Sequence, residues 1–300
     1  MVDHKPKSAV EIRELRGIDE LRQVESVERS VWGSTEIDML PLAFTVASLH
    51  AGSIWLGAFD GPTLVGFAFG FLGVDHGHLS FHSHMLAVLD PYRTLNLGCK
   101  LKLAQRDHVL ALRPSGARID EITWTFDPLH SRNAHLNFAK LGVISDQYKV
   151  DFYGPETSSL LHRNGTDRLW VRWPISSRRV HDRAQGKRNR TEVLDALSTV
   201  QPLLRFNGNG EPSRTDLPSA LARQRVVIEI PGDILEIEKK SPELARQWRT
   251  ETRWAFTESL KAGFLVTEFC RRIRGQQGPG AYLLERVTAA EYVPELAGRA

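Results

Sequence analysis

The sequence predicts a mixed α/β fold. Apolar runs of strand length, IWLGAF and TLVGFAFGFL, flank Asp60-Gly61-Pro62, a strong turn signal. Segments with helical periodicity lie on either side of these runs, at about residues 18–32 and 98–112. Apolar residues make up 41% of the chain and charged residues 25%, which is typical of a globular protein. Strands and helices that alternate along one chain predict a sheet covered by helices.

Each element of the first 175 residues has its own pattern. The predicted strands carry β-branched and aromatic residues and are AVEIREL, IWLGAF, TLVGFAFGFL, LSFHSHMLAV, IDEITWTF, QYKVDFYG and DRLWVRWPI. The predicted helices lie at about 18–32, 40–50, 98–112 and 130–141. Residues 1–175 are therefore expected to form one α/β domain.

The rest of the chain predicts a connector and a second, smaller α/β domain. Residues 176–224 contain the basic run RRVHDRAQGKRNR and the turn-rich run RFNGNGEPSRTDLPS, which suit a solvated linker. Residues 225–300 resume with the strand RVVIEIPGD, a helix at 242–262 and the strands FLVTEFCRRI and AYLLERV. Ser241 and Pro242 are good starting signals for that helix.

Charge and cysteine content exclude several classes of protein. A net charge of +3 is too small to indicate nucleic-acid binding, although it suits a small anionic ligand. Cys99 and Cys270 form neither a disulfide framework nor a zinc motif, so a reducing cytoplasm is expected. The turn at residues 60–62 interrupts the apolar stretch 54–74, so we expect two strands there, not a membrane span.

Residues 92–100, YRTLNLGCK, join a strand to a helix that is expected to start near Gly98. Unpaired N–H groups at such a helix start, together with the helix dipole, bind phosphate. Lys100 and Lys102 are placed in the first helical turn, where cations are unfavourable without a nearby anion, and Arg93 adds a third positive charge. The alternative is an ordinary turn with solvated basic side chains.

Two motifs resemble the GNAT N-acyltransferase superfamily. LAVLDPYRTLNLG is similar to its acyl-CoA signature: Arg93 and Gly98 match, while Asn96 stands at the position of the first glycine. That position is expected to need a positive φ, which asparagine tolerates best among the non-glycine residues. SRNAHLNFAKLGV resembles the later helix, with Phe138 at the place of a tyrosine that protonates the departing thiolate. The resemblance covers roughly residues 9–175.

The resemblance implies an acyl-CoA co-substrate, with acetyl-CoA favoured, and no metal. Backbone groups of Leu86, Ala87 and Val88 would bind the pantetheine and polarise the thioester carbonyl. Further contacts to the co-substrate would come from Arg93, Thr94, Asn96, Leu97, Gly98, Cys99, Lys100 and Asn133.

Candidates for proton transfer come from the residues themselves. His82 and His84, two apart on a strand, share a face and have pKa values suited to a general base; a structural role for either is the alternative. Glu121 is a carboxylate alternative, whereas Asp127 is expected to cap a helix. Tyr148 or Tyr153 could serve as the acid, or the thiolate could leave without one. Histidines 76, 78, 82 and 84 lack a zinc motif.

Arg249 and Arg253, one helical turn apart, repel each other unless an anion lies between them. They could bind the carboxylate of an acceptor or of a succinyl donor, or form internal salt bridges. The expected function is acyl transfer from acyl-CoA to the amine of a small molecule or amino acid, in a protein compatible with a homodimer. The alternatives are an amino-acid N-succinyltransferase and a non-catalytic CoA-binding or interaction module.

Overall fold

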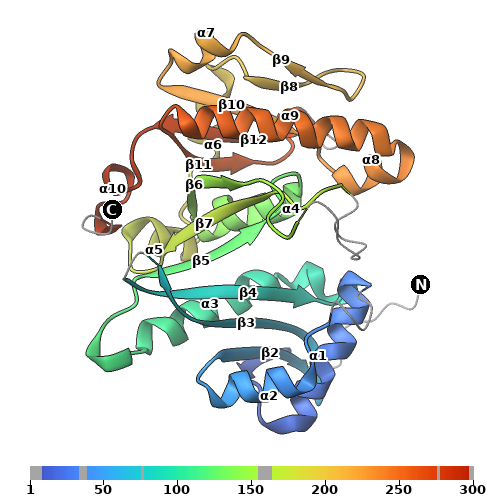
Figure 1. Cartoon of the computed structure of the whole chain (residues 1–300), viewed down its shortest axis with the longest axis vertical. Helices are drawn as coiled ribbons and strands as arrows, with labels where there is room; N and C mark the ends of the chain where they lie inside the picture. The colour runs from blue at the N-terminus through green and yellow to red at the C-terminus, as the bar shows by residue number, and fades with distance from the viewer. Residues whose placement is uncertain (1–8, 34–38, 76–77, 155–163, 276–277, 297–300) are drawn as a thin grey trace. The chain divides into compact units, whose positions relative to one another are not determined.

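The computed structural model describes residues 9–33, 39–75, 78–154, 164–275 and 278–296 (Figure 1). The chain divides into two compact units: unit 1 comprises Met1–Trp124 with Ser158–Arg163, and unit 2 comprises Thr125–Thr157 with Asn164–Ala300. The mixed α/β fold is confirmed. The division at Trp124 differs from the boundary expected at residue 175, because the strands after Thr125 join one sheet with those of the C-terminal region.

Unit 1 follows the predicted order of elements. They are β1 (Glu11–Glu14), α1 (Gly17–Trp32), α2 (Leu42–His50), β2 (Ile54–Asp60), β3 (Thr63–Asp75), β4 (His78–Val88), the 3₁₀ helix η1 (Asp90–Leu95), α3 (Leu97–Ala111), the 3₁₀ helix η2 (Pro114–Gly116) and β5 (Glu121–Phe126), whose last two residues belong to unit 2. Strands β1 to β4 pair antiparallel in sequence order, and β5 pairs parallel with β4. Gly61, at φ +60°, allows the tight turn between β2 and β3.

An aromatic core holds the sheet of unit 1 together. Trp55 on β2 stacks on Phe69 of β3 with ring centroids 4.0 Å apart. Leu21 and Val24, on the apolar stripe of α1, belong to the same buried cluster. Each such side chain contributes about 1.5–3 kcal/mol when fully buried, so the core fixes the positions of β2, β3 and α1.

Unit 2 contains the remaining elements. They are α4 (Ser131–Ala134), the π-helix η3 (His135–Leu141), β6 (Ile144–Lys149), β7 (Arg168–Pro174), α5 (Arg178–Ala184), α6 (Arg190–Ser198), β8 (Leu204–Phe206), β9 (Pro212–Arg214), α7 (Leu217–Leu221), β10 (Arg225–Ile230), α8 (Ile234–Lys240), α9 (Pro242–Lys261), β11 (Phe264–Cys270), β12 (Gly280–Arg286), α10 (Ala289–Tyr292) and the 3₁₀ helix η5 (Pro294–Leu296). Its strands lie in the order β7-β6-β11-β12-β10-β8-β9.

A helix followed by two antiparallel strands occurs twice in unit 2. The first set is η3, β6 and β7, and the second is α9, β11 and β12. The two sets meet where β6 pairs antiparallel with β11, at Ser145 and Val266. Helix α9 packs along β10, β11 and β6 (Figure 1). No internal repeat was expected from the sequence, so this structural repeat is a new finding.

The expected linker at residues 176–224 is wrong. The segment forms α5, α6, β8, β9 and α7. Ser177, Asn189 and Asp216 accept hydrogen bonds from backbone N–H groups and cap the three helices. The basic and turn-forming residues that suggested a linker are therefore cap and ion-pair residues of a folded segment.

None of the helices in the described part of the chain combines the length and apolar content needed to cross a membrane.

Candidate functional site

Strand β4 carries a β-bulge at its centre. Against β3, Met85 pairs with Phe69 and Ser83 pairs with Gly70, so His84 is an extra residue on β4. Gly70 permits this close approach, because a Cβ there would lie 2.7 Å from the His82 carbonyl oxygen and closer still to the Phe81 ring. The bulge bends β4 within unit 1.

Strand β4 is longer than its described ladder with β5. Among the described residues of unit 1, the parallel ladder consists of the pairs Phe81–Ile122 and His82–Thr123, while β4 continues to Val88. The edge of β4 beyond His82, including the predicted residues Leu86, Ala87 and Val88, is therefore a place where an extended ligand could hydrogen-bond to backbone groups.

The turn after β4 has the predicted backbone geometry. Asn96 adopts the left-handed conformation, with φ 59° and ψ 24°, which confirms the positive φ expected at this position. Helix α3 starts at Leu97, one residue before the expected Gly98, and its first intrahelical hydrogen bond runs from Lys100 to Asn96. The first amides of the helix therefore point toward its N-terminal end, as an anion site requires.

Arg93 fixes the turn to the end of β4. Its Nε donates to the Val88 carbonyl oxygen at 3.2 Å, and Nη1 lies 2.6 Å from an Asp90 oxygen. Thr94 and Lys100 are exposed beside it, whereas Cys99 is buried in α3. Arg93 thus acts first as a structural link, with its side chain still 38% exposed.

Lys102 is the residue that the sequence analysis misplaced. It was expected in the first turn of α3, beside an anion or in solvent. It is instead buried, with its Nζ donating to Ser83 Oγ at 2.8 Å and lying 3.4 Å from the centre of the Trp124 ring. Ser83 and Trp124 follow directly after His82 and Thr123, which pair in the described β4–β5 ladder. The ammonium group therefore lies beside the described β4–β5 pairs, and burial lowers the pKa of Lys102 well below its usual value.

The two predicted histidines lie together on β4. Their ring centroids are 6.1 Å apart, and both rings approach Phe71. His82 Nδ1 lies 3.1 Å from Thr123 Oγ1. Burial, with smaller effects of His84 and Lys102, lowers the pKa of His82 to about 4, so its ring is neutral at pH 7. Glu121 is buried at the start of β5.

Tyr148 is poorly suited to the predicted acid role. Its hydroxyl donates to Asp167 Oδ2 at 2.7 Å, and its ring stacks on Phe256. Burial and the Asp167 carboxylate raise the pKa of Tyr148 well above its usual value. A phenol held this way is a weaker acid than a free one, so the structure favours a packing role.

Phe138 lies in the core of unit 2. It packs edge-on against Tyr282, whose hydroxyl donates to the Pro128 carbonyl oxygen at 2.7 Å. Tyr153 and Asn133 are exposed in the same unit. The contribution of Asn133 to a co-substrate site stays a prediction.

The predicted carboxylate site at Arg249 and Arg253 is wrong. Arg249 binds both oxygens of Asp127, at 3.0 and 2.5 Å, and donates to the Asn164 carbonyl oxygen. Arg253 binds both oxygens of Asp167 and one of Asp151. Internal carboxylates therefore occupy both guanidinium groups, and the salt-bridge alternative holds.

Asp127 also differs from its predicted capping role. One of its oxygens accepts a hydrogen bond from Leu129 N, in a turn before α4 whose N-cap position is His130. Because Arg249 lies opposite, the pKa of Asp127 is well below its usual value in spite of burial.

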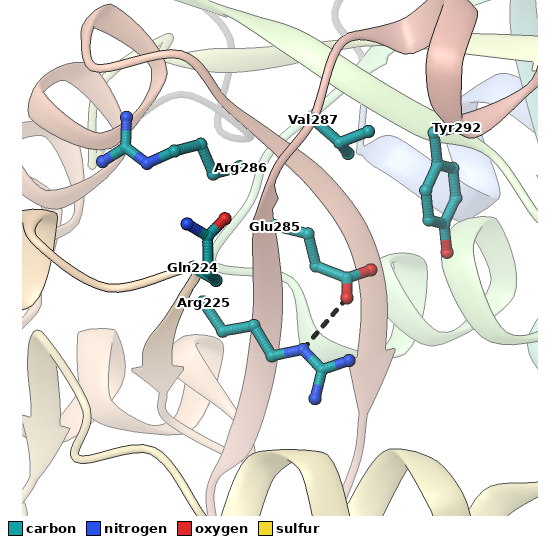
Figure 2. Close-up of a pocket in the computed structure, with 6 residues that line it drawn as sticks. All are labelled: Gln224, Arg225, Glu285, Arg286, Val287 and Tyr292. Atoms are coloured by element: carbon teal, nitrogen blue, oxygen red, sulfur yellow. Dashed lines mark hydrogen bonds and ion pairs between the residues drawn. The ribbon is translucent and has the colours of Figure 1, made fainter.

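Two cavities are found in unit 2. One of about 390 Å³ is shown in Figure 2, and a second of about 520 Å³ shares Arg225, Glu285 and Tyr292 with it. Neither is lined by a residue of β4 or of the α3 turn. Within the described residues, no cluster of His, Cys, Asp and Glu is placed to hold a metal ion.

Comparison with solved structures identifies similar acetyltransferases. The ribosomal-protein-S18-alanine N-acetyltransferase from Escherichia coli is 14% identical, with 56% of this chain and 95% of that chain covered and a TM-score of 0.44. NAA60 of Arabidopsis thaliana, in complex with a bisubstrate analogue, is 12% identical, with 55% and 97% covered and a TM-score of 0.44. Aminoglycoside 6'-acetyltransferase type Ii is 20% identical, with 56% and 99% covered and a TM-score of 0.43. No family model and no curated protein matches the chain.

Proposed function

We propose that this chain is an acyl-CoA-dependent N-acyltransferase that acts on the amine of a small molecule, with acetyl-CoA as the donor. The observation that supports this function best is a combination within unit 1: a bulged strand β4 that is longer than its described ladder with β5, followed by a left-handed turn at the N-terminus of α3. An extended thioester with a pyrophosphate at its far end matches that combination in shape and in charge.

Each part of the site has a chemical role in the proposal. The left-handed Asn96 and the first amides of α3 hold the pyrophosphate, with Lys100 adding positive charge. The backbone edge of β4 from Leu86 to Val88 holds the extended arm. Acyl-CoA supplies the activated acyl group, and a backbone N–H group near the bulge would stabilise the oxyanion of the tetrahedral intermediate.

Proton transfer is assigned to the polar cluster beside the bulge. The acceptor amine must lose a proton, and its uptake is assigned to His84 or His82, directly or through water. Burial lowers the pKa of both imidazoles, and His82, with a pKa of about 4, is a weaker base than an ordinary histidine. Lys102, whose ammonium donates to Ser83 and lies over the Trp124 ring, is assigned the role of the acid, because Phe138 has no ionisable group. A lowered pKa makes it a better proton donor to a thiolate whose own pKa is about 8.5.

Ligand binding tests the first half of the proposal. Coenzyme A at 100 times its Kd should stabilise the folded protein by about 2.7 kcal/mol, which is measurable as a rise in Tm. The full chain is heated with coenzyme A, acetyl-CoA and, as a control, adenosine. If millimolar acetyl-CoA leaves Tm unchanged, the proposed function is wrong.

Turnover tests the second half. The release of free thiol from acetyl-CoA is measured with a panel of amines. The variant Lys102→Met is compared with Lys240→Met, in which an exposed lysine of α8 is replaced. Loss of a general acid should lower kcat about 100-fold and leave KM for acetyl-CoA within a few fold. Lys240→Met should match the unmodified protein.

Phe138 supports one alternative, a non-catalytic CoA-binding module, because the position expected for the acid carries no ionisable group. That alternative predicts a Tm shift with coenzyme A and no thiol release with any amine. The N-succinyltransferase alternative loses its support, since Arg249 and Arg253 are held by internal carboxylates.

A further inference from the structure

The basic run RRVHDRAQGKRNR forms one wall of the larger cavity in unit 2. Residues of α5, the turn after it and α6 line a space of about 520 Å³ together with residues of β10, β11 and β12. The volume falls in the range of small-molecule sites. This segment was expected to be a solvated linker, but it lines an open cavity in unit 2.

Three arginines converge on a single carboxylate in this wall. Arg179, Arg183 and Arg188 all form ion pairs with Glu268, and their side chains are 17%, 9% and 12% exposed. Glu268 follows Thr267, the extra residue of a β-bulge in β11. Burial, together with its two arginine neighbours, lowers the pKa of Arg183 to about 10, so it stays cationic at pH 7.

The lining carries more positive than negative charge. Its cations are Arg178, Arg179, Arg183, Lys187, Arg188 and Arg225. Its carboxylates are Asp182, Glu192, Glu268 and Glu285. The surplus is two positive charges, and it arises at Glu268, because Arg178 pairs with Asp182 and Arg225 pairs with Glu285.

One hydrogen-bond donor in the same lining has no partner among the described residues. The Nε of Arg188 is buried without a partner, although its Nη2 binds Glu268 and the Phe269 carbonyl oxygen. A buried N–H group without an acceptor costs about 1–3 kcal/mol, so an added acceptor would be favourable. Arginine forks match phosphate oxygens in geometry as well as in charge.

Part of the lining is apolar. Val193 and Ala196 of α6, Leu283 of β12 and Tyr292 contribute it. Figure 2 shows the Arg225–Glu285 pair and Tyr292, which are the residues shared with the smaller cavity. A ligand that uses the whole space would therefore join an anionic group to an apolar body.

We propose that this cavity is a binding site for an organic phosphate monoester, with the phosphate held by Arg183, Arg188 and Lys187 and the apolar body against Val193, Leu283 and Tyr292. A phosphate monoester carries about −1.5 to −2 charges at pH 7, which matches the surplus of two. A monocarboxylate would neutralise half of that surplus.

Calorimetric titration of the full chain with phenyl phosphate tests the proposal, with inorganic phosphate and benzoate as comparison probes. Phenyl phosphate should bind saturably and more tightly than either. Arg183→Gln and Lys187→Gln should each weaken it at least 10-fold. Lys187 is exposed, so that variant keeps its fold even if Arg183→Gln does not. Arg246→Gln, an exposed arginine of α9, should bind like the unmodified protein.

Three results would overturn the proposal. The first is an absence of saturable binding by the unmodified chain, which would make the arginines a folding cluster. The second is binding that is equal in Lys187→Gln and Arg246→Gln, which would indicate an adventitious ion elsewhere. The third is loss of binding in Arg93→Gln, because that residue belongs to the proposed acyl-CoA site and should leave phenyl phosphate binding unchanged.

Discussion

Replacement of Asp127 by Asn should strongly destabilise unit 2. The substitution keeps the size of the side chain but removes the charge that compensates Arg249, whose side chain is 7% exposed. Arg249 would keep its bond to the Asn164 carbonyl oxygen and lose the paired contacts at 3.0 and 2.5 Å. A buried guanidinium would then lack a counter-ion.

The magnitude follows from the burial of the pair. Removing one partner of a buried ion pair costs about 3–5 kcal/mol, and the remaining amide oxygen places Asp127→Asn near the lower end. For a unit of this size, 1 kcal/mol corresponds to about 2–4 °C in Tm, so a fall of about 6–12 °C is expected. Glu236→Gln, which breaks an exposed pair with Lys240, should cost less than about 1 kcal/mol.

Urea and thermal unfolding, followed by circular dichroism, measure both variants, and a double-mutant cycle with Arg249→Met isolates the pair. The loss of unfolding free energy in the double variant should be at least about 2 kcal/mol smaller than the sum of the losses in the two single variants. Because the folded pKa of Asp127 is depressed, the stabilisation is present above the unfolded pKa of about 3.9 and is lost as pH falls below it. A fall in Tm of less than 2 °C, or strictly additive single effects, would refute this reasoning.

Three further substitutions test unit 1 by urea unfolding. Asn96→Ala should be about 1 kcal/mol less stable than Asn96→Gly, because alanine resists the left-handed backbone, and equal midpoints would contradict this. Burial raises the pKa of Glu28 to about 7, so the folded protein loses stability as pH rises from 4.5 to 7 and the buried carboxyl ionises. Glu28→Gln should remove this dependence of the unfolding free energy on pH and should be more stable than the unmodified protein by up to about 3 kcal/mol at pH 8. The pKa of His82 is lowered to about 4, so between pH 4 and 6.5 the unfolded chain binds a proton that the folded chain does not, and the free energy of unfolding should rise with pH. If His82→Gln shows the same rise, His82 is not its cause.

Local features of the candidate site could be predicted from the sequence. The strands and helices of unit 1 follow from apolar periodicity, and the left-handed turn follows from the steric preferences of Asn96. The burial of Lys102 could have been predicted as well. It lies three residues from both Cys99 and Gln105, so that all three share the buried side of α3.

Partners distant in the sequence could not be predicted. Arg249 and Asp127 are 122 positions apart, and Arg183 and Glu268 are 85 apart. A charged side chain is ordinarily assigned to solvent, and nothing in the local pattern identifies a carboxylate on another element. For the same reason the basic run of α5 suggested a linker, and Arg249 and Arg253 suggested an external anion.

The antiparallel contact between β6 and β11 has a practical consequence for dissecting this protein. A fragment ending at residue 175 would retain β6 without β11, which would expose the backbone N–H and C=O groups along one side of Ile144–Lys149. An unprotected strand edge is a template for pairing with other chains. The shortened protein is therefore expected to self-associate. In the full chain, β11 of the C-terminal region pairs with this strand edge.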